Sequence, residues 1–312
     1  MAVKELFELI RKLTPKDNFK PSTVQVLRSA VKPTIESPNT ASLSGAERVH
    51  FLACSRADCI LIESGGRFAL LDCGSAEYSE KTVEYLKSVA GGKIKLEFLA
   101  LTHLHSGHIG ALDALLEDKD IKIGKIYLKP FISSSIADWD KCRKDGECVY
   151  NGICQKAQSR NIPVIDAVPE EQFTLGGWKL KFFNTEPDGY HKNIGENDNS
   201  LALLLEAQGK RLLLTGDLVN DTGDLVRLAA TVGRVDVLKA PCHGERALPE
   251  GVMKKLRPDT VIITNRLANV SDAVLVDIMS AFGRRTYSTA DSGGVLLTVS
   301  DEGIFVTRGM QR

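Results

Sequence analysis

The stretch Thr102-His103-Leu104-His105-Ser106-Gly107-His108-Ile109-Gly110 holds three of the six histidines of the chain within six positions. An apolar run at residues 96–101 precedes it, and an apolar helical pattern follows it. This placement puts the imidazoles on a loop at the end of a buried strand. Because neutral imidazole is a common ligand of divalent transition metals, the stretch predicts a metal site.

The composition of the chain indicates an ordinary globular protein. Its 312 residues, 43% of them hydrophobic, suffice for one large core, which the strand-rich pattern favours. Forty basic and forty acidic residues cancel, so no net field gathers nucleic acid or anionic membrane, although a local basic groove stays open. Charges interrupt the apolar residues of the first 13 positions, and no run reaches transmembrane length. Seven scattered cysteines favour reduced thiols, so we expect a cytoplasmic protein without a membrane partner.

Hydrophobic periodicity predicts an N-terminal helix over residues 3–13 and a polar, proline-rich connector to residue 47. A single domain, residues 48–312, follows. Strands are expected at residues 49–54, 59–63, 67–72, 96–102, 125–128, 163–167, 172–175, 178–183, 200–206, 210–215, 235–240 and 261–264, with a final hairpin. Helices are expected from a cap at Ser79 to about Ala90, through Leu112 and Leu115, through Leu225 and Leu228, up to Leu256, and up to about Phe282. Strand blocks at both ends, each followed by strand–helix alternation, predict two sheets packed face to face with helices outside, an αββα sandwich of the α+β class.

Residues 132–161 form a polar, charged insertion that carries Cys142, Cys148 and Cys154 at an even spacing of six. Zinc knuckles bring cysteines two to four positions apart, so a helix or loop is the favoured interpretation over a metal site. Such an insertion has the length to roof a cleft.

Other candidate ligands also stand at or near strand ends. Asp72 lies two positions before a glycine and Asp217 directly after one, and each glycine permits a sharp turn. His191 and His243 lie in loops adjoining predicted strands, whereas His50 is typical of an ordinary strand residue. For each histidine alone the alternative is a local hydrogen bond. Together, imidazoles and carboxylates indicate one pooled site.

These segments and their order also carry a family resemblance. From about residue 48 to 307 the chain resembles a metallo-β-lactamase-fold hydrolase, more narrowly the ComEC-type branch, and it is similar also to phosphorylcholine-esterase-like members. The matching pieces are Leu-Leu-Asp72-Cys-Gly, Thr-His103-Leu-His105-Ser-Gly-His108, Glu-Asn-Asp-Asn199-Ser200-Leu, Thr-Gly-Asp217 and Leu-Lys239-Ala-Pro-Cys-His243-Gly.

The resemblance implies a two-metal site at one edge of the sandwich. His103, His105 and His191 would hold the first metal, and His108 and His243 the second. Asp217 would bridge the two, with Asp217 and His243 as catalytic residues, and Asp72 would orient the histidine loop. Zinc, as one or two ions, is the expected cofactor, and manganese or iron also suits these ligands.

Two positions depart from the family pattern. Gly107 stands where the family has an aspartate that binds the second metal, so the affinity for that metal should fall, although three protein ligands can still hold zinc. Cys242 stands where a histidine often precedes the ligand, and it is either a buried thiol or a substitute thiolate ligand. Asn199, Ser200 and Lys239 are candidate substrate contacts, with capping of the loop before a strand as the alternative for Asn199 and Ser200.

The expected activity is metal-dependent hydrolysis of a phosphoester or phosphodiester, in nucleic acid or in a small choline-type molecule, by a hydroxide that the metal makes available near neutral pH. One alternative is a metal-binding or regulatory module whose second site is degraded at Gly107. A third is a thioester or lactone hydrolase, which the absence of a Gly-His-Thr/Ser-Pro-Gly segment disfavours.

Overall fold

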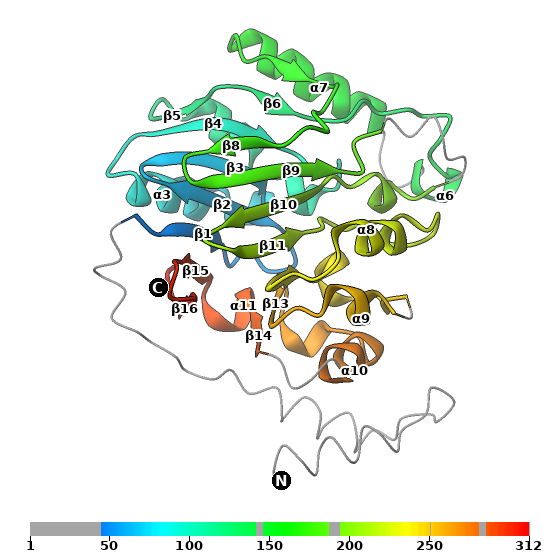
Figure 1. Ribbon diagram of the computed structural model, residues 1–312. Coiled ribbons are helices and arrows are strands. Elements are labelled where there is room, and N and C mark those ends of the chain that lie inside the picture. Colours follow the sequence, from blue (N-terminus) through cyan, green and yellow to red (C-terminus); the bar gives the residue numbers. More distant parts are fainter. Residues whose placement is uncertain (1–44, 142–145, 187–193, 250, 281–284, 312) are drawn as a thin grey trace.

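Two β-sheets face each other in the computed structural model, which describes residues 45–141, 146–186, 194–249, 251–280 and 285–311 (Figure 1). The predicted 3–13 helix and most of the connector lie outside these residues, as do His191 and Cys142. Within the described residues, the first sheet has the order β16-β15-β1-β2-β3-β4-β6-β7, with β5 paired to β4, and the second has the order β14-β13-β12-β11-β10-β9-β8.

The strands of the first sheet are β1 (Glu47–Phe51), β2 (Cys59–Ser64), β3 (Arg67–Cys73), β4 (Ile94–Ala100), β5 (Ile121–Ile123), β6 (Ile126–Tyr127), β7 (Val164–Ile165), β15 (Val295–Val299) and β16 (Ile304–Arg308). Those of the second are β8 (Phe173–Leu175), β9 (Trp178–Phe183), β10 (Ala202–Ala207), β11 (Lys210–Leu214), β12 (Val237–Lys239), β13 (Thr260–Ile263) and β14 (Arg285–Ser288). The α-helices are α3 (Ser79–Val89), α4 (Ser106–Ile109), α5 (Leu112–Glu117), α6 (Asp138–Lys141), α7 (Gly146–Ser159), α8 (Asp224–Val232), α9 (Val252–Leu256), α10 (Asp272–Ser280) and α11 (Thr289–Ser292), and the 3₁₀ turns are η2 (Ala76–Tyr78), η3 (Glu196–Asn199), η4 (Pro241–Gly244) and η5 (Leu267–Asn269).

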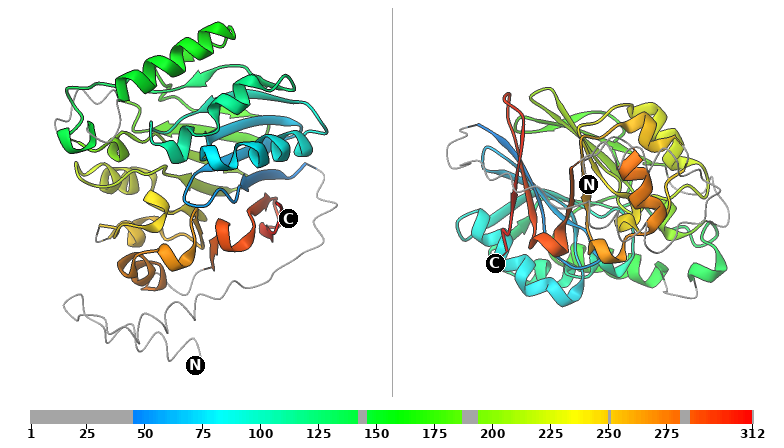
Figure 2. Two further views of the ribbon diagram at one scale, coloured as in Figure 1. Left: turned by 180° about the vertical axis from the view of Figure 1, so that it is seen from behind. Right: turned by 90° about the horizontal axis from the view of Figure 1, so that it is seen from below.

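The alternation of side chains along the strands explains the layers. In β2, Ile60 and Ile62 point into the core between the sheets, whereas Leu61 points outward to pack with helix residues such as Leu86. In β11, Leu212 points into the same inner core and Leu213 into a third cluster that includes residues of α8, α9 and α10. Helices therefore cover the outer face of each sheet, as the right-hand view in Figure 2 shows. The predicted αββα sandwich is confirmed.

Parallel pairing directs the strand ends to one edge. β3 pairs in parallel with β4, and β11, β12, β13 and β14 form a parallel series. Since the carboxyl ends of parallel strands meet at the same edge, the loops after β4, β11 and β12 gather there.

Several sequence-based boundaries differ from the structure. Ser79 begins α3 but does not cap it through its side chain, because its hydroxyl donates to the carbonyl of Ala76. The strand expected at residues 163–167 shortens to β7, and the insertion is largely helical, as α6 and α7. Among the described residues, no helix combines the length and the apolar character needed to cross a bilayer.

Candidate metal centre

Asp72 fastens the histidine loop to the first sheet. Its backbone takes the left-handed conformation (φ 56°), which is uncommon outside glycine and turns the carboxylate toward the loop. The backbone N–H and the hydroxyl of Thr102 donate to this carboxylate over 2.7 and 2.8 Å. His108 Nδ1 lies 2.7 Å from the same group, so Nδ1 carries a proton and Nε2 faces the site. Asp72 thus lies behind the His108 ring and contacts the residue that begins the histidine loop.

Asp217 is the point where ligands from the two sheets converge. It follows β11, and its Oδ1 lies 3.4 Å from His108 Nε2 and 3.3 Å from His243 Nε2. Burial opposes charge on all three groups, but their mutual attraction outweighs it. The pKa of Asp217 is therefore lowered, and that of His243 raised, by these contacts. For His108 the carboxylates of Asp217 and Asp72 raise the pKa to about 10 against the effect of burial. A divalent cation at this point would displace the protons that the metal-free site attracts.

His103 and His105 present a second set of nitrogens. His103 Nδ1 lies 3.1 Å from the Thr102 hydroxyl and 3.2 Å from the Ser200 hydroxyl, which leaves Nε2 for a ligand. Burial, and then the neighbouring His108, lower the pKa of His103, so the ring is neutral, as metal ligation requires. The His105 ring lies 4.7 Å from that of His103, centroid to centroid. His191, the remaining expected ligand, lies outside the described residues.

Asp58, between β1 and β2, is a member of the site that sequence reasoning missed. Its side chain is 1% exposed; Oδ1 lies 3.2 Å from His243 Nδ1, and Oδ2 lies 2.5 Å from Lys239 Nζ. The hydroxyl of Thr264 lies 2.9 Å from the same His243 nitrogen. Lys239 and His243 lower the pKa of Asp58 despite its burial. Asp58 contacts Nδ1 of His243 in the same way that Asp72 contacts Nδ1 of His108. In both histidines Nε2 is thereby turned toward Asp217.

The three expected substrate contacts do not line the pocket. Lys239 is completely buried, and its ammonium donates to the Gly216 carbonyl over 2.7 Å and lies 3.6 Å from Asp217 Oδ1. Ser200 is also completely buried, where its hydroxyl accepts the Asp217 N–H. Asn199 is 4% exposed and lies against Glu196. These residues lie behind the ligands, and the residues of this segment that line the pocket are Glu196 and Asn197.

Gly107 packs against residues 56 and 57, which directly precede Asp58. A Cβ at position 107 would lie 3.2 Å from the Arg56 carbonyl oxygen and 3.6 Å from the Ala57 Cα. The Asp58 N–H donates to the Gly107 carbonyl over 3.1 Å. The absence of a side chain thus permits a close approach of this segment to the histidine loop.

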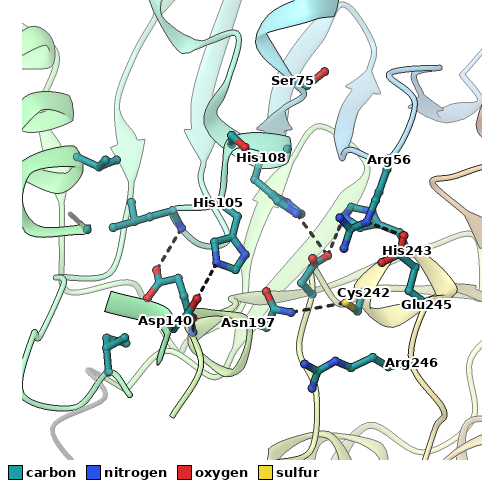
Figure 3. A pocket seen from close by; sticks show the side chains of 18 of the residues that line it. Arg56, Ser75, His105, His108, Asp140, Asn197, Cys242, His243, Glu245 and Arg246 are labelled. Carbon is teal, nitrogen blue, oxygen red and sulfur yellow. Dashed lines mark hydrogen bonds and ion pairs between the residues drawn. The ribbon is translucent and has the colours of Figure 1, made fainter. Parts of the chain in front are cut away.

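Cys242 lines the pocket as a neutral thiol. Burial and the neighbouring Asp217 raise its pKa to about 12. Its sulfur accepts a hydrogen bond from the Asn197 amide over 3.5 Å, as Figure 3 shows. These contacts favour the buried thiol over the thiolate ligand. In the insertion, Cys148 and Cys154 both lie on α7.

A pocket of about 590 Å³ opens over these ligands (Figure 3). This volume lies within the usual range for small-molecule sites. The metal-binding candidates that line it are His105, His108, Asp217 and His243. An apolar side is made by Leu104, Phe131, Ile136 and Val149, and a charged side by Arg56, Glu245 and Arg246.

The donor set fits a divalent cation. His103 Nε2, His108 Nε2 and Asp217 Oδ1 are buried and have no hydrogen-bond partner of good geometry among the described residues. His103, His108 and Asp217 offer ligand atoms that all lie within 4.8 Å of one another. Buried polar atoms left unpaired are costly, and metal coordination by one or two ions would satisfy all three.

The family model for the metallo-beta-lactamase superfamily matches residues 53–264. The chain belongs to the metallo-β-lactamase superfamily, whose members are generally metal-dependent hydrolases. The match spans β2 to β13 and so contains the histidine loop, Asp217 and His243.

Individual relatives have low sequence identity to this chain. ComE operon protein 3 of Bacillus subtilis (strain 168) is 26% identical over 215 residues, which are 66% of this chain and 25% of that protein. The metallo-beta-lactamase fold-containing protein ST1585 of Sulfurisphaera tokodaii is 29% identical over 107 residues, 31% of this chain and 39% of the relative. The chain thus spans well under half the length of either relative. Among solved structures, the metallo-beta-lactamase fold protein YhfI of Bacillus subtilis is 16% identical, with a TM-score of 0.49, over 85% of this chain and 100% of that one.

Proposed function

We propose that this protein is a metal-dependent phosphodiesterase that acts on nucleic acid or on a small organic phosphodiester. The observation that carries the proposal is the convergence of His108 Nε2 and His243 Nε2 on Asp217 Oδ1 at the base of an open pocket. The similarity to ComE operon protein 3 supports placing this chain in the ComEC-type branch of the family. The resemblance to that branch is what suggests cleavage of phosphodiesters.

A bound divalent cation would supply a hydroxide nucleophile near neutral pH and would stabilise charge developing on phosphoryl oxygens. The residues of the chain would hold and orient that cation. His103 and His105 would bind on one side of Asp217, and His108 and His243 on the other, with Asp72 and Asp58 fixing the latter two rings. The ligand set suits zinc best, and also manganese or iron.

The charged side of the pocket supports an anionic substrate. Arg56 lines it with a side chain 58% exposed, paired with Glu245 over 2.5 Å, and Arg246 lies 3.7 Å from Asp221. Exposed ion pairs of this kind contribute about 0–1 kcal/mol, so either guanidinium can turn to a phosphate at little cost. Cys54, Cys59, Cys73, Cys154 and Cys242 are free thiols, which supports the proposed cytoplasmic location.

The decisive experiment measures metal content and turnover together. Purified protein should contain at least one transition metal ion per chain and should cleave bis-(p-nitrophenyl) phosphate with added zinc or manganese. His103→Ala should abolish both, whereas His50→Gln, at a buried histidine that bonds Tyr85 and Glu63 away from the pocket, should abolish neither. Thioester and lactone substrates belong in the same panel. Metal-free protein whose activity is unchanged by His103→Ala would refute the proposal.

Gly107 favours one alternative, a metal-binding or regulatory module that retains only the first metal. In that case the protein would bind one ion per chain and hydrolyse none of the panel. Full occupancy of two ions with no hydrolysis would exclude the degraded second site as the reason for inactivity.

A further inference from the structure

The insertion is joined to the metal centre through its N-terminal half. The N–H of Ala137 donates to the carbonyl of Ile194 over 2.7 Å, and the N–H of Ile194 donates to the carbonyl of Ser135 over 3.0 Å. Ile136 and Ile194 form a parallel bridge. Residues 135–137 therefore hold the chain just before η3 in a fixed place.

Asp140, in the short helix α6, extends this connection to the histidine loop. Its side chain is 4% exposed, and Oδ2 accepts the Glu196 N–H over 2.6 Å. Glu196 in turn accepts the N–H of Leu104, the residue between His103 and His105, over 3.1 Å. With Oδ2 held in this way, Oδ1 is directed at His105 Nε2, 3.7 Å away (Figure 3).

We propose that Asp140 is a positioning residue that fixes the His105 ring for metal binding, an inference that rests on the proposed function. A distance of 3.7 Å exceeds a hydrogen bond, but the His105 side chain is 32% exposed and has room to turn the small amount needed. A carboxylate that accepts Nε2–H fixes the tautomer, leaves Nδ1 as the ligand atom and makes that atom more basic.

The other rings of the centre support this reading. Asp72 stands behind His108 at Nδ1, and Asp58 stands behind His243 at Nδ1. Asp140 would complete the series, at the opposite nitrogen of His105. The difference is its origin: Asp72 and Asp58 come from the sandwich, whereas Asp140 comes from the insertion. The insertion is therefore part of the metal centre as well as a wall of the pocket.

The test compares Asp140→Asn with Asp138→Asn, an exposed position two residues away in the same helix. Asparagine at 140 retains an acceptor for the Glu196 N–H but loses the charge that His105 faces. Cobalt(II) is the probe, because its affinity is measured by chelator competition and its absorption spectrum reports the ligand geometry. Loss of such an outer carboxylate typically weakens metal affinity about 10–100-fold.

We expect Asp140→Asn to bind the tighter cobalt ion about 10–100-fold more weakly, with an altered spectrum, and saturating cobalt to restore most of its turnover. Asp138→Asn should match the wild type. Equal affinity and an identical spectrum for Asp140→Asn and wild type would overturn the proposal, as would an equal loss in Asp138→Asn. Wild-type protein that binds no cobalt would instead refute the proposed function, so the two failures are distinguishable.

Discussion

The buried pair of Lys239 and Asp58 makes the sharpest prediction about stability. Lys239 Nζ lies 2.5 Å from Asp58 Oδ2, and the two side chains are 0% and 1% exposed. Burial disfavours both charges, yet Asp58 raises the pKa of Lys239 and Lys239 lowers that of Asp58. Each of the two charges is therefore compensated chiefly by the other, with His243 and Asp217 as the next contributors.

Lys239→Met removes the ammonium but keeps most of the volume, which leaves Asp58 buried near Asp217 without its nearest cation. Breaking a buried pair on one side costs about 3–5 kcal/mol in the free energy of unfolding. At about 2–4 °C per kcal/mol for a domain of this size, the melting temperature should fall by roughly 6–20 °C. Asp58→Asn alone should also destabilise, because the ammonium then lacks its nearest anion.

The double variant Asp58→Asn with Lys239→Met removes both charges. Replacing a whole buried pair is often close to neutral, so its loss should be smaller than the sum of the single losses by about 2 kcal/mol or more. Urea unfolding of metal-free protein, with all four proteins at one pH, measures this coupling. Additive losses, or a Lys239→Met loss below about 1 kcal/mol, would show that the pair does not carry its charges in the folded state. Metal affinity should stay weakened in the double variant, because His243 has lost the carboxylate behind its ring.

Three further predictions concern single positions. Gly107→Ala and Gly107→Asp both place a Cβ 3.2 Å from the Arg56 carbonyl oxygen, but only aspartate adds a carboxylate. In calorimetric titration the Gly107→Asp protein should therefore bind the second metal at least about tenfold more tightly than the Gly107→Ala protein. Equal affinities would contradict the explanation that Gly107 is a missing ligand. Burial raises the pKa of Glu196 to about 7 from its ordinary 4.5, so this carboxyl group binds its proton more tightly in the folded protein than in the unfolded chain. The free energy of unfolding of the wild type should therefore decline as pH rises from about 4.5 to 7. Glu196→Gln should abolish that decline and exceed wild-type stability at pH 8 by up to about 3 kcal/mol in urea unfolding, and an unchanged pH profile would refute the buried-acid assignment. Cys242→Ser should leave metal content unchanged, because the thiol is neutral; a loss of metal by elemental analysis would identify it as a ligand.

The parts of the centre that follow local patterns were predictable from sequence. His103, His108, Asp217 and His243 lie in the segments that follow the buried strands β4, β11 and β12, and strand ends are visible as apolar runs that stop at a glycine or a polar residue. His50 was likewise recognisable as a strand residue, and it bonds Tyr85 and Glu63 inside the first sheet.

The supporting carboxylates were not predictable in this way. Asp58 and Asp140 belong to the centre only through contacts with residues far along the chain, and nothing near them separates them from the other 38 acidic residues among the 40 in the chain. Lys239 and Ser200 were noticed because they lie in segments that carry the family resemblance. Their side chains point away from the pocket, however, and the direction of a side chain at a strand end depends on the turn that follows it.

The division of the ligands between the sheets has a mechanical consequence. The histidine loop follows β4 of the first sheet, whereas Asp217 and His243 follow β11 and β12 of the second. An ion bound among them would link the two sheets of the sandwich, because the sheets could not separate without releasing it. At roughly 100 times its dissociation constant such an ion adds about 2.7 kcal/mol to the free energy of unfolding. Chelation should therefore loosen both sheets at once, so that amide hydrogen exchange quickens in β4 and β12 together although neither strand touches the ion.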